Sequence, residues 1–148
     1  LDPQVDIGQG VIGTRSWEGD VPYPGKLHEK PSLLGLRSLV LPTHPELNRF
    51  LKSRFPQARE GGIVTLDRYV DQNDPLHHQT WGVPPLVVDQ ETAAVHKAVW
   101  MVRIPFAAML LVSDLAWDEE QAEKSVLEYL PQAAERLADW MEQLFFRL

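Results

Sequence analysis

Hydrophobic residues recur at helical spacing within one short stretch of the first half of the chain, residues 43–55. Steps of three and four separate its apolar positions, so they form one stripe along a helix. The stripe consists of Leu47, Phe50, Leu51 and Phe55. Thr43 and Glu46 have the spacing of a capping box, and Pro56 cannot continue a helix. The pattern therefore predicts a helix over residues 43–55 with this stripe buried.

A second helix is expected over residues 90–102, where alanine and valine recur on one side. Asp89 precedes this segment and is suited to cap its free first-turn amides. Val99 lies on the apolar side and is expected to be buried. Pro105 ends or kinks the helix, and the apolar run that follows, residues 106–115, fits either a buried helix or a strand.

The C-terminal segment, residues 114–148, is predicted to be an acidic pair of amphipathic helices. A capping-box spacing begins at Asp118 and predicts a helix over residues 118–130. Pro131 suits the first turn of a second helix over residues 132–147. The apolar seam of that helix is expected to be buried, and it includes Leu137, Met141 and Leu144.

Strand signals are concentrated before residue 90. Residues 61–70 follow a glycine pair and are rich in β-branched side chains, which predicts a strand. The weaker strand candidates are residues 11–17, 33–42 and 83–89. Residues 1–32 hold many glycines and prolines and are expected to be loop-rich. The predicted fold is α+β, a single domain over residues 1–148. An irregular mixed α/β N-terminal body with a small sheet precedes a helical C-terminal third.

Composition narrows the classes of protein and site that the chain can represent. Its 148 residues fit one domain, and the lack of cysteine excludes disulfides, thiolate metal sites and cysteine nucleophiles. The most apolar run, residues 98–112, is too short to cross a bilayer and contains Arg103 and Pro105. The chain begins with Leu1, so we expect a processed or trimmed N-terminus. A cytoplasmic location without a membrane partner is predicted.

Charge is unevenly distributed along the chain, whose net charge is −7. Residues 114–142 hold nine acidic and two basic residues, whereas residues 26–59 hold seven basic and two acidic ones. This asymmetry favours an exposed acidic surface that binds a basic protein partner. The acidic residues predicted to bind it are Glu119, Glu120, Glu123, Glu128, Glu135, Asp139 and Glu142. A homodimer through the C-terminal helix is a further possibility, and nucleic acid is not expected because the chain is negative overall.

Candidate catalytic or metal-binding residues are concentrated in one stretch, residues 67–81, which includes "DQNDPLHHQTWG" from Asp71 to Gly82. Carboxylates and imidazoles are the groups that bind metal ions or move protons near neutral pH. The candidate metal ligands are Asp71, Asp74, His77 and His78, with Asp67 nearby. Adjacent histidines usually point in different directions, so a structural loop is the favoured interpretation. His96 is interpreted as a surface or hydrogen-bonded core histidine.

The functional prediction rests on the lack of a recognisable catalytic motif. The chain has no P-loop, GxGxxG, GxSxG or HExxH motif. We therefore predict a non-catalytic protein-binding module of the inhibitor, immunity, chaperone or assembly-factor type, with no cofactor. The alternative is a small metal-assisted hydrolase with its site in the loop of residues 67–81.

Overall fold

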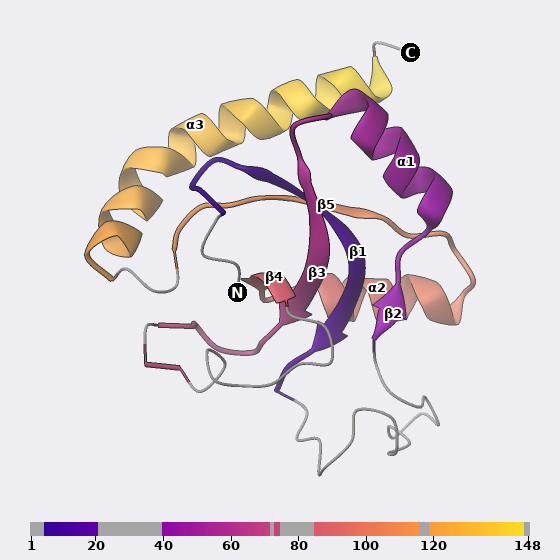
Figure 1. Cartoon of the computed structure of the whole chain (residues 1–148), viewed down its shortest axis with the longest axis horizontal. Coiled ribbons are helices and arrows are strands. Elements are labelled where there is room, and N and C mark those ends of the chain that lie inside the picture. Colours follow the sequence, from indigo (N-terminus) through magenta and orange to yellow (C-terminus); the bar gives the residue numbers. More distant parts are fainter. Residues whose placement is uncertain (1–4, 21–39, 72, 75–84, 116–118, 147–148) are drawn as a thin grey trace.

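The computed structural model describes residues 5–20, 40–71, 73–74, 85–115 and 119–146. These residues form an α/β structure with a mixed five-stranded sheet and three helices (Figure 1). The strands are β1 (Gly10–Glu18), β2 (Leu41–Pro42), β3 (Arg59–Thr65), β4 (Pro85–Asp89) and β5 (Ala108–Leu111). The order across the sheet is β2-β1-β3-β4, and β5 also pairs with β1. The expected mixed α/β body with a small sheet is therefore confirmed.

Three strands, β1, β3 and β4, are parallel, with β4 at one edge of the sheet, while β2 and β5 pair with β1 in the antiparallel sense. Consecutive residues of the central strands are buried, as in Val11 and Ile12 or Ile63 and Val64. Such runs are typical of parallel sheets covered on both faces. The parallel arrangement also brings the carboxyl ends of β3 and β4 to the same edge of the sheet.

The strand predictions are largely confirmed, with shifted boundaries. Residues 11–17 lie in β1, and most of residues 83–89 lie in β4. The predicted strand over residues 61–70 is displaced, because β3 ends at Thr65. The sequence of residues 106–115 fitted either a buried helix or a strand, and the structure places the strand β5 there. Of residues 33–42, the last two form β2, and residues 33–39 lie outside the described residues.

A bulge in β1 lets the strand contact two different helices. Ile12 and Ser16 are four positions apart and would share one face of a regular strand. The register against β3 shifts between Gly13 and Arg15, and an inserted residue of this kind reverses the facing of the residues beyond it. Ile12 accordingly packs in the hydrophobic cluster with the helices α1 and α3, whereas Ser16 is hydrogen-bonded to His96 of α2.

The first two helices, α1 (Pro45–Arg54) and α2 (Thr92–Met101), lie within the predicted ranges. The capping box predicted at the start of α1 does not form. The N-cap residue is His44, and it makes no side-chain cap bond. The Thr43 hydroxyl instead donates to the carbonyl oxygen of Gly13 at 2.7 Å and accepts from the Asn48 amide at 2.7 Å. Thr43 therefore ties the start of α1 to β1.

The predicted pair of C-terminal helices is wrong, because one helix, α3 (Glu119–Phe145), runs through Pro131 (Figure 1). The buried side of this helix is also rotated from the predicted seam. Leu137 and Met141 are 43% and 55% exposed. Leu144 does pack against the body as predicted, and the other contacts come from Ala133 and Trp140. The Trp140 ring packs against Phe55 with ring centroids 5.4 Å apart, and a bulky aromatic contact of this kind decides which side of the helix is buried.

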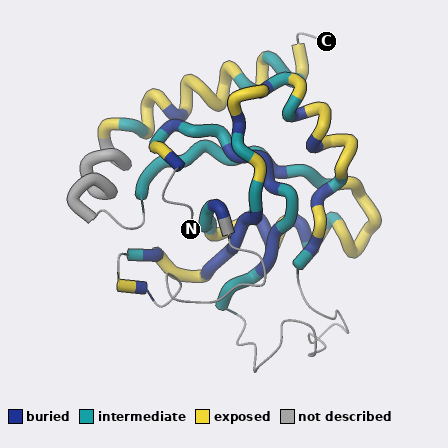
Figure 2. The backbone as a smooth tube through the Cα atoms, in the orientation of Figure 1, coloured by how far each residue is buried: buried dark blue, intermediate teal, exposed yellow. Residues whose placement is uncertain are grey.

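The core lies along the sheet rather than along the predicted helical stripes (Figure 2). Of the apolar stripe of α1, Leu51 and Phe55 are buried as predicted. Leu47 and Phe50 are each 37% exposed, contrary to the prediction, because the packing side of α1 is narrower than its apolar stripe. Val99 is half-buried. The fully buried side chains are concentrated in β1 and β3 and include Trp17, Ile12 and Ile63.

Within the described part of the chain, none of the helices combines the length and the apolar character that crossing a bilayer demands.

Candidate active site

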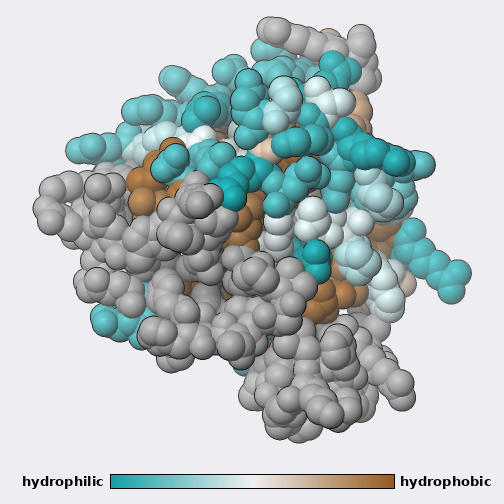
Figure 3. All heavy atoms as spheres, viewed as in Figure 1, coloured by the Kyte–Doolittle hydropathy of each residue, from teal (hydrophilic) through white to brown (hydrophobic). Residues whose placement is uncertain are grey.

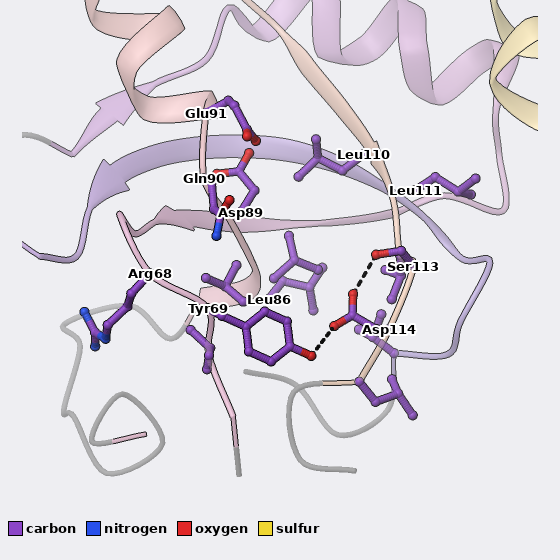
Figure 4. A pocket seen from close by; sticks show the side chains of 16 residues that line it. Arg68, Tyr69, Leu86, Asp89, Gln90, Glu91, Leu110, Leu111, Ser113 and Asp114 are labelled. Atoms are coloured by element: carbon purple, nitrogen blue, oxygen red, sulfur yellow. Dashed lines mark hydrogen bonds between the residues drawn. The ribbon is translucent and has the colours of Figure 1, made fainter. Parts of the chain in front are cut away.

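A cavity of about 370 Å³ lies beside β4, between the segment that follows β3 and the segment that follows β5 (Figure 4). The open ends of parallel strands are common ligand sites in α/β proteins, because the loops that leave them converge there. Segments remote in sequence meet at this cavity. They are Val5, residues 68–70 after β3, residues 86–91 around the end of β4, and residues 110–115 around the end of β5.

One end of the cavity presents a carboxyl group held by two hydroxyl groups. The Ser113 hydroxyl donates to Oδ1 of Asp114 at 2.6 Å, and the Tyr69 hydroxyl donates to Oδ2 at 3.2 Å. Both contacts are visible in Figure 4. Asp114 and Ser113 are half-buried. The carboxyl group of Asp114 therefore has a defined orientation beside an aromatic ring.

A second acidic group lies at another part of the cavity wall, at the start of α2, where Figure 4 shows Asp89, Gln90 and Glu91 close together. Glu91 occupies the N-cap position of α2, yet within the described structure its side chain makes no capping bond. Asp89 performs that task and accepts hydrogen bonds from the backbone amide and the hydroxyl group of Thr92. The N-cap position thus lies at Glu91 rather than at Asp89 as predicted, although Asp89 makes the capping bond. The exposed carboxylate of Glu91 is available to the cavity.

The wall between these carboxyl groups is largely apolar. Its side chains include Leu110, Leu111 and Val112 from the end of β5, and Leu86 of β4. A cavity with an apolar wall and a few convergent polar groups is the usual form of a small-molecule site.

Arg68 borders the cavity but is occupied by ion pairs. Its Nε and Nη2 atoms donate to the two oxygens of Asp74, both at 2.9 Å, and Nη1 contacts Asp20. The hydrogen-bonded carboxylate of Asp74 raises the pKa of the Arg68 guanidinium, an effect that burial opposes. In Figure 4 the Arg68 side chain points away from the other labelled residues. This clamp anchors the loop that carries Tyr69.

The two predicted metal ligands that the structure describes, Asp71 and Asp74, make other contacts. Asp74 is bound by Arg68, and Oδ1 of Asp71 accepts the backbone amide of Asn73 at 2.7 Å, which is a local turn contact. His77 and His78 lie outside the described residues. The residues that the structure describes contain no group of three potential metal ligands.

A second hollow, of about 780 Å³, lies between the start of α1 and the end of α2 and is lined by His44, His96 and Trp100 among others. His96 is 2% exposed, its Nδ1 atom lies 2.8 Å from the Ser16 hydroxyl, and its ring stacks on Phe106. Burial lowers the pKa of His96, because it disfavours the charged imidazolium. These contacts are those of a hydrogen-bonded core histidine, which was one of the two predicted alternatives.

The predicted acidic surface lies on a different part of the molecule. Glu128, Glu135, Asp139 and Glu142 are exposed on α3, and the side chains of Glu119, Glu120 and Glu123 lie outside the described residues. Hydrophilic residues predominate along α3, which lies at the upper edge of the space-filling view (Figure 3). None of these positions borders the cavity at the strand ends.

The sequence interpretation missed the cavity residues Tyr69, Glu91 and Asp114. Asp114 was counted only as part of the acidic segment. One signal could have found it, because Asp89, Glu91 and Asp114 each follow an apolar run that forms a strand. Segments that leave the ends of strands are common places for functional residues.

A family comparison agrees with this geometry, because the model described as the phosphorylase superfamily matches residues 1–145. The chain belongs to the phosphorylase superfamily. No curated protein gives a significant match to its sequence.

Solved structures of several enzymes have the same fold as this chain. A 5′-methylthioadenosine/S-adenosylhomocysteine nucleosidase from Neisseria meningitidis, in complex with methylthio-immucillin-A, is 26% identical with a TM-score of 0.77. A Borrelia burgdorferi protein assigned the same activity and bound to adenine has 17% identity and a TM-score of 0.79. Futalosine hydrolase from Helicobacter pylori has 20% identity and a TM-score of 0.75.

These alignments cover almost all of this chain but only part of each solved protein. They include 100%, 99% and 97% of this chain, and 65%, 64% and 62% of the Neisseria, Borrelia and Helicobacter proteins. The chain thus spans less than two thirds of the length of the structures it matches.

The family assignment overturns the functional prediction. A non-catalytic module that binds a basic protein partner is wrong, as is the expectation that the chain is not an enzyme. The phosphorylase superfamily and the solved neighbours are catalytic, and the neighbours are nucleosidases and a hydrolase with small-molecule substrates. A homodimer through the C-terminal helix stays a prediction.

Proposed function

We propose that the chain forms the catalytic part of an enzyme that cleaves the N-glycosidic bond of a purine nucleoside and releases the base. The observation that supports this most directly is the strand-end cavity, in which the carboxyl groups of Asp114 and Glu91 border one apolar space in a phosphorylase-superfamily fold. The nucleosidase and hydrolase neighbours favour water as the acceptor of the sugar.

Asp114 is the group we assign to the leaving base. When the bond between the sugar and the base breaks, the electron pair of that bond goes to the base, and a proton on a base nitrogen makes this departure easier. The Asp114 carboxyl group donates that proton, while water adds to the anomeric carbon and loses a proton, which returns through solvent to Asp114. The hydroxyl groups of Ser113 and Tyr69 fix the orientation of the Asp114 carboxyl group for this transfer.

Glu91 is the group we assign to the sugar. Its carboxylate accepts hydrogen bonds but cannot donate them, so it suits the hydroxyl groups of a ribose. A hydrogen bond to a charged acceptor also orients the sugar relative to Asp114. The Tyr69 ring borders the same space and offers a flat apolar face to a purine.

The apolar wall indicates the substituent that the site accepts. Leu110, Leu111 and Val112 offer no charged group to a phosphate or a carboxylate, and they favour an apolar group on the sugar. The thioether of 5′-methylthioadenosine has this character, and this compound is named in the activity of two of the neighbours.

The proposed reaction is tested by release of free base from a panel of nucleosides. The purified protein is incubated with 5′-methylthioadenosine, S-adenosylhomocysteine, futalosine and adenosine, and the base is measured by liquid chromatography. Each reaction is run with and without inorganic phosphate. We expect base release from at least one adenine nucleoside at a rate independent of phosphate. Release that depends on phosphate would replace hydrolysis by phosphorolysis, and no release from any member would refute the proposal.

A further inference from the structure

The carboxylate of Asp89 borders the cavity, but the protein itself uses its oxygens. Oδ1 accepts the hydroxyl of Thr65 at 2.6 Å, and Oδ2 accepts the backbone amide of Thr92 at 3.1 Å together with the Thr92 hydroxyl. A carboxylate offers about four acceptor positions, so three donors leave little capacity for a substrate. Asp89 is therefore a structural acceptor placed beside the site.

Thr65 completes the same network from the neighbouring strand. Its hydroxyl oxygen accepts the backbone amide of Ala93 at 2.9 Å while its proton is donated to Asp89. Thr65 is 4% exposed and Thr92 is 7% exposed, so these bonds are shielded from water. The backbone amide of Leu66 also donates to the carbonyl of Asp89 at 2.9 Å, which joins the ends of β3 and β4.

Side chains of this network, and not the side chain at the N-cap position, cap the first turn of α2. First-turn amides of a helix lack helical partners and are normally satisfied by the N-cap side chain. Here the amides of Thr92 and Ala93 are satisfied by Asp89 and Thr65, which lie at the ends of two strands. Glu91 holds the N-cap position without using its carboxylate for the helix.

We propose that Thr65 and Asp89 are positioning residues that hold the backbone around Glu91 and so aim its carboxylate at the sugar of a bound nucleoside. The sugar contact of Glu91 rests on the proposed function, whereas the network itself does not. Removing the Thr65 hydroxyl leaves the Ala93 amide and one Asp89 oxygen without this partner. The first turn of α2 then moves, and Glu91 moves with it. The loss should therefore depend on the sugar hydroxyl groups and not on the base.

The test compares variants on two substrates that differ in the sugar. Thr65→Val removes the hydroxyl at nearly constant volume, and Thr65→Ser restores it. Thr43→Val is the matched control, because Thr43 is also a buried threonine with hydroxyl bonds, but it lies away from this cavity. Values of kcat and KM are measured for 5′-methylthioadenosine and for its 2′,3′-dideoxy counterpart, after melting curves have established that each variant folds.

For the hydroxylated substrate we expect Thr65→Val to lower kcat/KM about tenfold, mainly through KM, as the misplacement of one charge-assisted hydrogen bond predicts. The kcat/KM values of Thr65→Ser and Thr43→Val should stay within about twofold of the wild-type value. For the dideoxy substrate the wild type and the three variants should have the same kcat/KM, because the hydroxyl groups that Glu91 binds are missing. Equal losses on both substrates, or an equal loss in Thr43→Val, would overturn the positioning role.

Binding measurements separate this inference from the proposed reaction. Calorimetry with adenine and with carbocyclic adenosine, which keeps both hydroxyl groups but resists glycosidic cleavage, needs no turnover. Thr65→Val should weaken carbocyclic adenosine about tenfold and leave adenine unchanged. If the wild-type protein releases no base, while Thr65→Val still weakens the binding of carbocyclic adenosine and not of adenine, the reaction is refuted and the positioning role is supported. Equal effects on both ligands, or wild-type binding that does not distinguish them, would overturn it.

Discussion

The carboxylates at the strand ends and those on α3 have opposite surroundings. Asp89 and Asp114 each accept hydrogen bonds from neighbouring side chains beside a cavity. Glu135 and Asp139 are exposed on a long helix. The α3 segment has the greater density of acidic residues, yet the strand ends have the convergent geometry. The comparison shows that the surroundings of a carboxylate, and not its abundance in the sequence, indicate a site.

The largest expected effect is a loss of kcat when a carboxylate beside the cavity is neutralised, compared with one on α3. Asp114→Asn keeps the size of the side chain but removes its ability to donate an acidic proton, so we expect kcat to fall by about 10²–10⁴-fold. Glu135→Gln makes the same kind of change on α3 and should leave kcat unchanged. Both variants are assayed for base release from the preferred nucleoside. Comparable activity of Asp114→Asn and the wild type would remove Asp114 from the mechanism.

A second contrast concerns stability. Ile63 is fully buried in β3, whereas Met141 is 55% exposed on α3. Ile63→Ala should lower the free energy of unfolding by about 2–5 kcal/mol, because it removes buried methylene groups and leaves a cavity. Met141→Ala should change it by less than about 0.5 kcal/mol. Denaturant titrations measure both values, and a large loss in Met141→Ala would show that this side of α3 is covered in solution.

A third prediction uses the buried histidine beside the sheet. Burial lowers the pKa of His96 below its ordinary value, so the unfolded chain binds a proton more readily than the folded one. The contribution of the neutral His96 to stability is complete above the unfolded pKa of about 6.5 and decreases as the pH falls toward the folded pKa. His96→Gln should therefore show a shallower loss of stability below pH ~6.5 than the wild type. Thermal melts between neutral and mildly acidic pH measure the two slopes, and identical slopes would contradict the prediction.

The smallest expected effect concerns the surface of α3. Neutralising Glu135 and Asp139 together, as Glu135→Gln and Asp139→Asn, should alter the free energy of unfolding by less than about 0.5 kcal/mol, because both side chains are exposed. The KM for the nucleoside should not change, since neither residue borders the cavity. Melts and steady-state kinetics on the double variant are sufficient. A large change in KM would connect α3 with the site.

Much of the secondary structure could be predicted from local patterns. Helices α1 and α2 lie in segments with regular apolar spacing and proline or aspartate at the start, and Asp89 has the capping contact expected of it. The buried side of α3 could not be predicted in this way, because its apolar residues cover more of the helix than the body contacts. Trp140 packs against Phe55, which is remote in sequence, and that contact decides the rotation of the helix.

The candidate site was less predictable than the elements that form it. Proximity in sequence made Asp71, Asp74, His77 and His78 the candidate metal ligands, although a structural loop was the favoured interpretation. The structure gives Asp71 a local turn contact and Asp74 the Arg68 side chain as a partner. Tyr69, Glu91 and Asp114 are separated by at least twenty residues from one another, and each looks ordinary in its own segment.

The sequence by itself determined the positions of α1 and α2, most of the strand segments and the exclusion of cysteine chemistry, because short-range spacing and residue type decide these features. Only the tertiary structure decided which carboxyl groups share a cavity, which side of α3 is buried and which side chains cap α2. The physical reason is that hydrogen bonds such as Thr65 to Asp89 and Tyr69 to Asp114 join residues 24 and 45 positions apart. No local pattern encodes such pairs. The parallel pairing of β3 with β4 brings Thr65 to Asp89, and the tertiary fold brings the segment after β3 to the segment after β5.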